Sequence, residues 1–140
     1  MDTISLCLIL ERLKLHEVKV LAADQFITEM IRGTKGLFIV NNQPSTESGE
    51  HWLAISTIGD TNEFFDSFGN NAAYYNSDFA IYLHPYIYNR RCLQGSKTVV
   101  CWAYCIFYLQ KRVSGMTLEC IASLFSDDVF RNDNEIVKRL

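Results

Sequence analysis

The sequence lacks the features that mark several large classes of protein. Its 140 residues contain no apolar run long enough to span a membrane, and residues 1–6 carry an acid and no early Lys or Arg. We therefore expect neither a membrane protein nor a secreted one. The net charge of −3 at pH 7 supplies no broad positive field for a phosphate backbone, so nucleic acid is not an expected partner.

Cysteine is also too sparse for a disulfide framework. The five cysteines are odd in number and lie mostly within apolar, periodic segments, which suits a reducing compartment such as the cytosol or nucleus. Cys101 and Cys105 are one helical turn apart, but no second Cys or His pair has the spacing of metal ligands. We expect no metal and no other cofactor.

The remaining composition is that of a globular protein, with 49% hydrophobic and 21% charged residues and no repeat or linker. We expect one domain, residues 1–140, of the α+β class. Its predicted core is a small central mixed β-sheet packed against a buried helix that starts at Cys101, with flanking helices. Apolar periodicity and capping residues predict helices at 2–15, 22–32, 72–83, 101–112, 118–125 and 135–140, the last capped by Asn132 or Asp133. Runs of β-forming residues predict strands at 36–40, 51–58, 63–68 and, as an edge strand, 90–93.

Cys101 is a candidate nucleophile because it follows a polar, glycine-containing turn and begins an apolar, helix-like run. A thiol at a helix start faces unpaired backbone N–H groups and the positive end of the helix dipole, which favour the thiolate. The Cys101 N–H and the side-chain amide of Gln94 could together hold the oxyanion of an acyl-transfer reaction. The alternative is a cysteine that serves as a small hydrophobe in a buried helix.

A reactive cysteine needs a base, and the chain offers only His16, His51 and His84. His16 is read as a solvated charge near a helix end, and His84 as a packed or turn-forming residue before Pro85.

A predicted hairpin turn at 59–62 brings His51, at the start of one strand, close to Asp66, at the end of the next. A carboxylate on one imidazole nitrogen fixes the tautomer and stabilises the imidazolium, so this pair is the orienting half of a catalytic triad. The alternative is a histidine at a strand end and an aspartate that forms an ordinary turn.

In order along the chain, these motifs are His51-Trp52, Phe65-Asp66-Ser67-Phe68-Gly69, Gln94-Gly95 and Val100-Cys101 followed by a helix. This order resembles the adenovirus protease (adenain) family of cysteine endopeptidases over about residues 21–109. The likeness is nearest to the versions carried by virophages and by Maverick/Polinton elements, and it extends more distantly to the proteases of ubiquitin-like modifiers. The resemblance implies Cys101 as nucleophile, His51 as general base and acid, Asp66 as its orienting partner and Gln94 as oxyanion donor.

The chain departs from the family pattern in two places at the site. Trp102 follows the nucleophile where the family usually has glycine, so it could narrow the cleft or point outward. Asp66 stands where the adenovirus enzyme has glutamate, and either carboxylate can orient an imidazole. The chain is also shorter than the adenovirus enzyme, so we expect the segments that bind its activating cofactors to be missing.

The resemblance implies an endopeptidase that cleaves viral or transposon precursor proteins, such as capsid proteins, during maturation. Its partners would be extended peptide segments of those precursors, its location the virion or the host cytoplasm or nucleus, and its state a monomer. Two alternatives stay open: a protease that removes ubiquitin-like modifiers, or an acyltransferase, on the same scaffold; and a catalytically silent interaction module.

Overall fold

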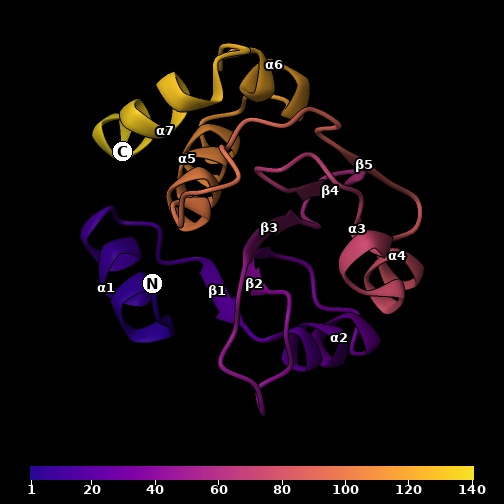
Figure 1. The fold of residues 1–140 in the computed structure, drawn as a ribbon. Coiled ribbons are helices and arrows are strands. Elements are labelled where there is room, and N and C mark those ends of the chain that lie inside the picture. Colours follow the sequence, from indigo (N-terminus) through magenta and orange to yellow (C-terminus); the bar gives the residue numbers. More distant parts are fainter.

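The computed structural model describes residues 1–140 and has a five-stranded mixed β-sheet with helices on both faces (Figure 1). The strands lie in the order β1-β2-β3-β4-β5. The two outer pairs are parallel and the two inner pairs antiparallel. The strand bounds are β1 Val18–Leu21, β2 Leu37–Asn41, β3 Trp52–Ser56, β4 Asn62–Phe65 and β5 Tyr86–Tyr88. The predicted α+β class with a small mixed sheet is confirmed.

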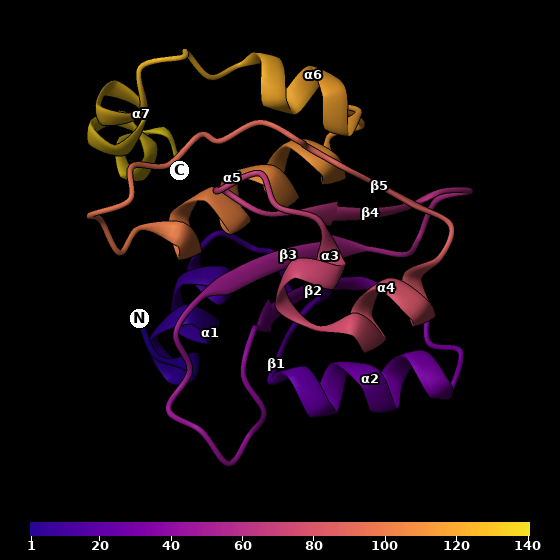
Figure 2. The ribbon, with the colours of Figure 1, turned by 45° about the vertical axis from the view of Figure 1, so that its right-hand side comes forward.

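Side chains that alternate along the strands divide the core into two layers. Leu37 and Ile39 of β2 belong to the larger hydrophobic cluster, whereas Phe38 and Val40 belong to the smaller one on the opposite face. The larger cluster lies under α1 (Thr3–Arg12), α5 (Cys101–Val113), α6 (Leu118–Ser123) and α7 (Val129–Ile136). The smaller cluster lies under α2 (Ala23–Ile31), α3 (Ala72–Tyr75) and α4 (Ser77–Leu83). Figure 2 shows these two groups of helices on opposite sides of the sheet.

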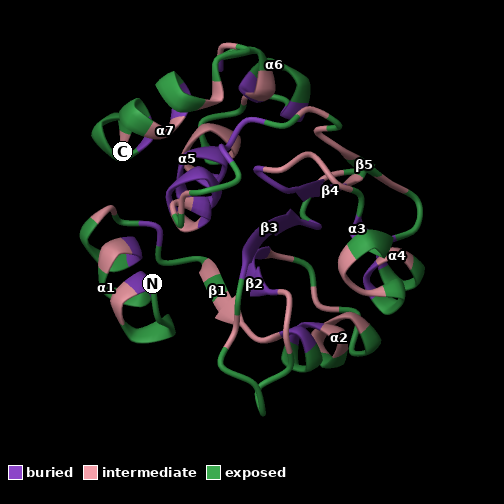
Figure 3. Cartoon of the chain, in the orientation of Figure 1, coloured by how far each residue is buried: buried purple, intermediate pink, exposed green.

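Helix α5 is the predicted buried helix, largely purple in Figure 3. It begins at Cys101, as expected. Its contacts with β4 hold it in one position on the sheet. The Tyr108 ring stacks on Phe65 with centroids 4.9 Å apart, and the Tyr108 hydroxyl donates to Glu63 Oε1. Arg112 Nε donates to the same carboxylate at 3.2 Å. Because α5 is fixed in this way, the position of its first residue against the sheet is fixed too.

The helices predicted at 2–15 and 118–125 form, with some changes in their bounds, as α1 and α6. Asp2 caps α1 by accepting from Ser5 N at 2.7 Å, and Thr117 caps α6 by accepting from Cys120 N at 3.2 Å. The single helix predicted over 72–83 is divided into α3 and α4 at Asn76, whose φ is −161° and whose Oδ1 accepts from Asp78 N. None of the helices combines the length and the apolar character that a membrane crossing requires.

The prediction of an edge strand at 90–93 is wrong, because the edge strand is β5 and the chain turns at its end. Arg90 has a positive φ of 57°, which interrupts the extended conformation. Arg91 then donates its guanidinium to Ala122 O and Phe125 O, at 2.8 and 2.7 Å, so this segment binds the end of α6 instead of pairing with a strand. The strand β1 was not predicted at all.

The prediction that Asn132 or Asp133 caps a final helix at 135–140 is also wrong. Asp128 caps α7 by accepting from Phe130 N and Arg131 N, and a short 3-10 turn, Val137–Arg139, follows the helix. Asn132 and Asp133 lie inside α7, and both bond to the segment that leads to α5. Asn132 Nδ2 donates to Leu93 O at 3.0 Å, and Asp133 Oδ2 accepts from Gly95 N at 2.9 Å.

Candidate active site

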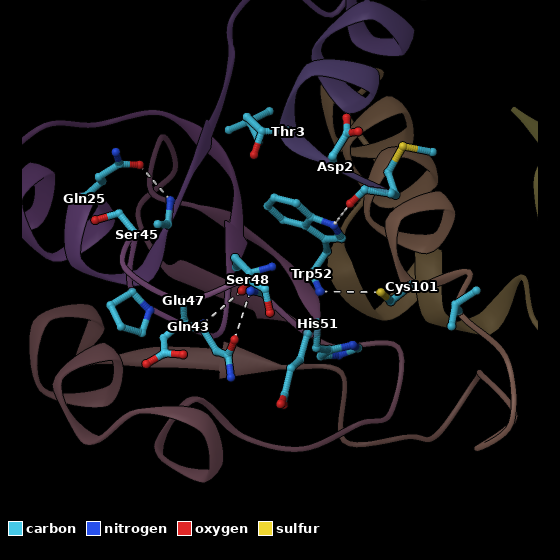
Figure 4. Close-up of a pocket in the computed structure, with 18 of the residues that line it drawn as sticks. Asp2, Thr3, Gln25, Gln43, Ser45, Glu47, Ser48, His51, Trp52 and Cys101 are labelled. Atoms are coloured by element: carbon cyan, nitrogen blue, oxygen red, sulfur yellow. Dashed lines mark hydrogen bonds between the residues drawn. The ribbon is translucent and has the colours of Figure 1, made fainter.

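Cys101 is the first residue of α5 and lies against the start of β3. Its Sγ accepts a hydrogen bond from the backbone N–H of Trp52 at 3.5 Å (Figure 4). The side chain borders a cavity although only 6% of the residue is exposed. A helix N-terminus and a strand N–H therefore surround this sulfur with donors, which favours the thiolate.

His51 immediately precedes β3 and is held by three side chains. Its Nε2 is 2.7 Å from Oδ1 of Asp66. Its ring stacks on Phe68 and on Tyr75, with centroid separations of 4.9 and 5.4 Å. Because Asp66 occupies Nε2, the nitrogen left to exchange a proton with Cys101 is Nδ1.

Asp66 immediately follows β4 and is completely buried, with 0% exposure. Besides the His51 ring it accepts from Phe68 N at 3.1 Å, Asn70 N at 3.0 Å and Tyr75 OH at 2.6 Å. Its backbone is held as well, because Asn89 accepts from Asp66 N and donates to Asp66 O. These donors satisfy the buried carboxylate and hold it in place beside the imidazole.

The two reactive groups shift each other's pKa in opposite directions. Burial would lower the pKa of His51, but its hydrogen bonds to Asp66 and Cys101 and the negative charges of both raise that pKa to about 9. Burial would raise the pKa of Cys101, but the hydrogen bond and charge of His51 and the N–H groups of Trp52 and Trp102 lower it. These shifts favour a thiolate beside an imidazolium.

The Gln94 side chain lies on the approach to α5 and is 1% exposed. Ser67 Oγ donates to its Oε1 at 2.5 Å and so holds the oxygen end of the amide. Its Nε2 donates to Thr98 O and Thr98 Oγ1, at 3.0 and 3.1 Å. An amide nitrogen carries two hydrogens, so an oxyanion beside Cys101 would share this donor with Thr98.

The site opens into a cavity of about 660 Å³, a size in the range of ligand pockets. The N-terminal residues, the 41–51 loop and the 94–99 segment form most of its wall. Three carboxylate residues, Asp2, Glu47 and Glu50, and no Lys or Arg, are among its lining residues. Trp102 is not part of the lining and packs against the larger hydrophobic cluster, so it does not narrow this cavity.

The structure thus brings Cys101, His51, Asp66 and Gln94 to one end of the sheet. His16 and His84 are exposed and line no part of the cavity. Sequence reasoning missed several polar residues that hold these four side chains, and no local pattern marks them: Tyr75, Asn89, Thr98 and Asp133.

No family model matches the sequence, and no curated protein matches it. The chain is similar to the crystal structure of the selenomethionine form of the ASFV pS273R protease, with a TM-score of 0.48 and 18% identity. The similarity covers 86% of this chain and 61% of that one, so the chain spans less than two thirds of that protease. The resemblance to the adenovirus protease family, and the roles it implies for the four residues, stay predictions.

Proposed function

We propose that the chain is a cysteine endopeptidase. The observation that supports this most strongly is the placement of three side chains: Cys101 at a helix N-terminus, the buried imidazole of His51 interacting with it, and the fully buried carboxylate of Asp66 on Nε2 of that ring. This arrangement provides a nucleophile, a base and an orienting group. The proposal rests on these side chains of the chain itself.

The geometry supports the following reaction. The Cys101 thiolate attacks the substrate carbonyl carbon, a C–S bond forms, and the carbonyl electrons become an oxyanion that the Cys101 N–H and the Gln94 amide stabilise. The C–N bond then breaks, and imidazolium His51 gives its proton to the leaving amine. Neutral His51 next takes a proton from water, the hydroxide attacks the thioester, and the carboxylic acid and the thiolate are released.

The proposed substrates are extended segments of viral or transposon precursor proteins, such as capsid proteins. Two features support this class. The order of the motifs around His51, Asp66, Gln94 and Cys101 is that of the maturation proteases named above. The cavity beside Cys101 is bordered by the irregular loop between β2 and β3, residues 42–51, and by the N-terminal residues, so an extended peptide can lie along its wall.

The test uses the purified chain with two reagents: an electrophilic activity-based thiol label and a library of extended peptides. We expect one label at Cys101 and hydrolysis of a subset of peptides, with both lost in Cys101→Ala. The matched control is Cys120→Ser, which changes an exposed cysteine of α6 outside the cavity. This control should label and cleave like the wild type.

The products separate the alternatives. Transfer of the acyl group to an added amine, with little hydrolysis, would indicate an acyltransferase. Cleavage after a folded ubiquitin-like domain, without cleavage of extended peptides, would indicate a deconjugating protease. If Cys101 is not labelled and no substrate is turned over, the proposal is overturned and the catalytically silent interaction module is the remaining alternative.

A further inference from the structure

Asp133 of α7 makes three hydrogen bonds to the segment around the nucleophile. Its Oδ2 accepts from Gly95 N at 2.9 Å and from Thr98 Oγ1 at 3.0 Å, and its Oδ1 accepts from Tyr104 OH at 2.6 Å. A Cβ at Gly95 would lie 2.8 Å from Asp133 Oδ2, so a larger residue here would displace this carboxylate. The C-terminal helix therefore binds the loop between Gln94 and Cys101 at two separate points.

These contacts continue from Asp133 to the proposed oxyanion donor. The Thr98 hydroxyl has one proton and two acceptors in reach, Gly95 O at 3.2 Å and Asp133 Oδ2 at 3.0 Å, and the shorter, charge-assisted bond to the carboxylate is the stronger one. With this proton on Asp133, the oxygen of Thr98 accepts from Gln94 Nε2 at 3.1 Å. Burial and hydrogen bonding to Asp133 raise the pKa of Tyr104, so its hydroxyl stays a donor to the same carboxylate.

We infer that Asp133 is a positioning residue for the oxyanion donor: it orients the Thr98 hydroxyl, which in turn orients the Gln94 amide. This inference rests on the proposed function. Asp133 makes no hydrogen bond to His51 or Cys101, so its effect is confined to oxyanion stabilisation and leaves the thiolate unchanged.

The experiment compares Asp133→Ala with Asp133→Asn and Asp128→Ala. Asparagine keeps one oxygen for Gly95 and Thr98, and its NH2 can donate to Tyr104 OH, whose proton can still go to Leu93 O at 3.2 Å. Asp128 caps the same helix but contacts only Phe130 N and Arg131 N with its carboxylate, so it controls for general loosening of α7.

Three measurements separate oxyanion positioning from a structural role. In Asp133→Ala we expect kcat to fall about tenfold with KM nearly unchanged, less than the roughly hundredfold loss from removing an oxyanion donor outright. A peptide aldehyde, whose thiol adduct carries an oxyanion, should bind about tenfold more weakly, in proportion to kcat. The rate of Cys101 alkylation by iodoacetamide, a reaction without an oxyanion, should not change. Asp133→Asn should recover most of both losses, and Asp128→Ala should lower thermal stability only.

If Asp133→Ala does not fold, Thr98→Val tests the same chain of hydrogen bonds by removing one hydroxyl, and the same pattern is expected. Wild-type kcat and aldehyde affinity in these variants would overturn the inference alone. A parallel loss in the rate of Cys101 alkylation would also overturn it, because it would show a general distortion of the site. Equal losses of kcat and aldehyde affinity in Asp128→Ala would do the same. A wild-type protein that neither cleaves peptides nor labels at Cys101 would overturn the proposed function as well.

Discussion

Tyr75 donates its hydroxyl to Asp66 Oδ2 at 2.6 Å while its ring stacks on His51, whose Nε2 binds the other carboxylate oxygen. One side chain from α3 thus holds both the orienting carboxylate and the face of the imidazole. Its two contacts involve different parts of the residue, so substitution can separate them.

Tyr75→Phe removes the hydroxyl and keeps the ring. We expect kcat/KM to fall about tenfold, which corresponds to roughly 1.4 kcal/mol, because Asp66 loses a donor while its other hydrogen bonds remain. Steady-state kinetics with a cleaved peptide measures the loss. Tyr74→Phe is the matched control, since Tyr74 is the next residue and 70% exposed. Equal activity in the two variants would show that the hydroxyl has no role in orienting Asp66.

Asp66→Asn should cut kcat by about a thousandfold or more, because an amide favours the wrong tautomer of His51 and cannot stabilise its imidazolium. It should also destabilise the fold. Both carboxylate oxygens accept from backbone N–H groups, so an NH2 would face a donor from Phe68 or Asn70, at a cost of about 1–3 kcal/mol. Thermal melting measures the loss of stability, and kinetics at temperatures below the melting transition measure the loss of turnover. Near-wild-type turnover would mean that another group orients His51.

The central part of this fold could be predicted because its signals are local. The polar turn before Cys101 and the apolar run after it specify a buried helix, and β2 is a continuous apolar strand buried on both faces. The proximity of His51 and Asp66 follows from one short connection between two antiparallel strands, residues 57–61, whose register places the start of one near the end of the other. These relationships connect residues that are near in sequence or share one hairpin.

The contacts that hold the site could not be predicted because they join distant segments. Strand β1 has four residues between two helices, too few for a clear period, and its partner β2 follows only after α2. From the sequence, Asp133 is predicted to be an ordinary helix-capping residue. Its hydrogen bond with Gly95 joins two residues that are 38 positions apart in the chain. Tyr75 reads as one aromatic residue among many in a short helix, and its bond to Asp66 depends on how α3 packs.

The coupled pKa values of His51 and Cys101 predict a bell-shaped pH dependence of kcat/KM. As pH falls through the lowered pKa of Cys101, the thiolate is protonated and activity is lost. As pH rises through about 9, imidazolium His51 loses the proton that the leaving amine needs, and activity is lost again. A profile measured from pH 4 to 10 should therefore fall on its alkaline side near pH 9. An alkaline limb near pH 6.5 would contradict the ion pair.

The same coupling predicts that Cys101 is the one fast-reacting thiol at pH 6. Burial raises the pKa of Cys92 and, together with the charges of Cys101 and Asp66, that of Cys105, so neither competes as a thiolate. His51→Ala should move the alkylation midpoint of Cys101 to higher pH, because the hydrogen bond and charge that lower its pKa are removed. Mass-spectrometric mapping of iodoacetamide adducts against pH measures this. Labelling of Cys105 as fast as Cys101 would reject the assignment of the nucleophile.

The last prediction concerns activation, because the adenovirus protease that the motif order resembles is stimulated by DNA and by a disulfide-linked peptide. The basic residues near the present site are few: Lys97, Arg90 and Arg91. The Arg91 guanidinium is occupied by Ala122 O and Phe125 O, and that of Arg90 lies over the Tyr88 ring at 4.7 Å. DNA affinity depends on clustered cations that release counterions, and the cavity wall carries carboxylates instead.

We therefore expect the 140-residue chain to cleave a suitable peptide at the same rate with and without duplex DNA. Cys92→Ser should keep the rate within about threefold, since the serine hydroxyl can replace the 3.3 Å hydrogen bond from Cys92 Sγ to Gln94 O, a contact that a covalent peptide would disrupt. Both proteins are assayed at low and moderate salt, because a response that comes from phosphate contacts falls steeply as salt rises. A large stimulation of cleavage by DNA that disappears at moderate salt would show that the positive charges of Lys97 and Arg90 outweigh the acidic cavity wall. A strong loss of cleavage rate in Cys92→Ser under reducing conditions would show that this thiol acts in the site itself.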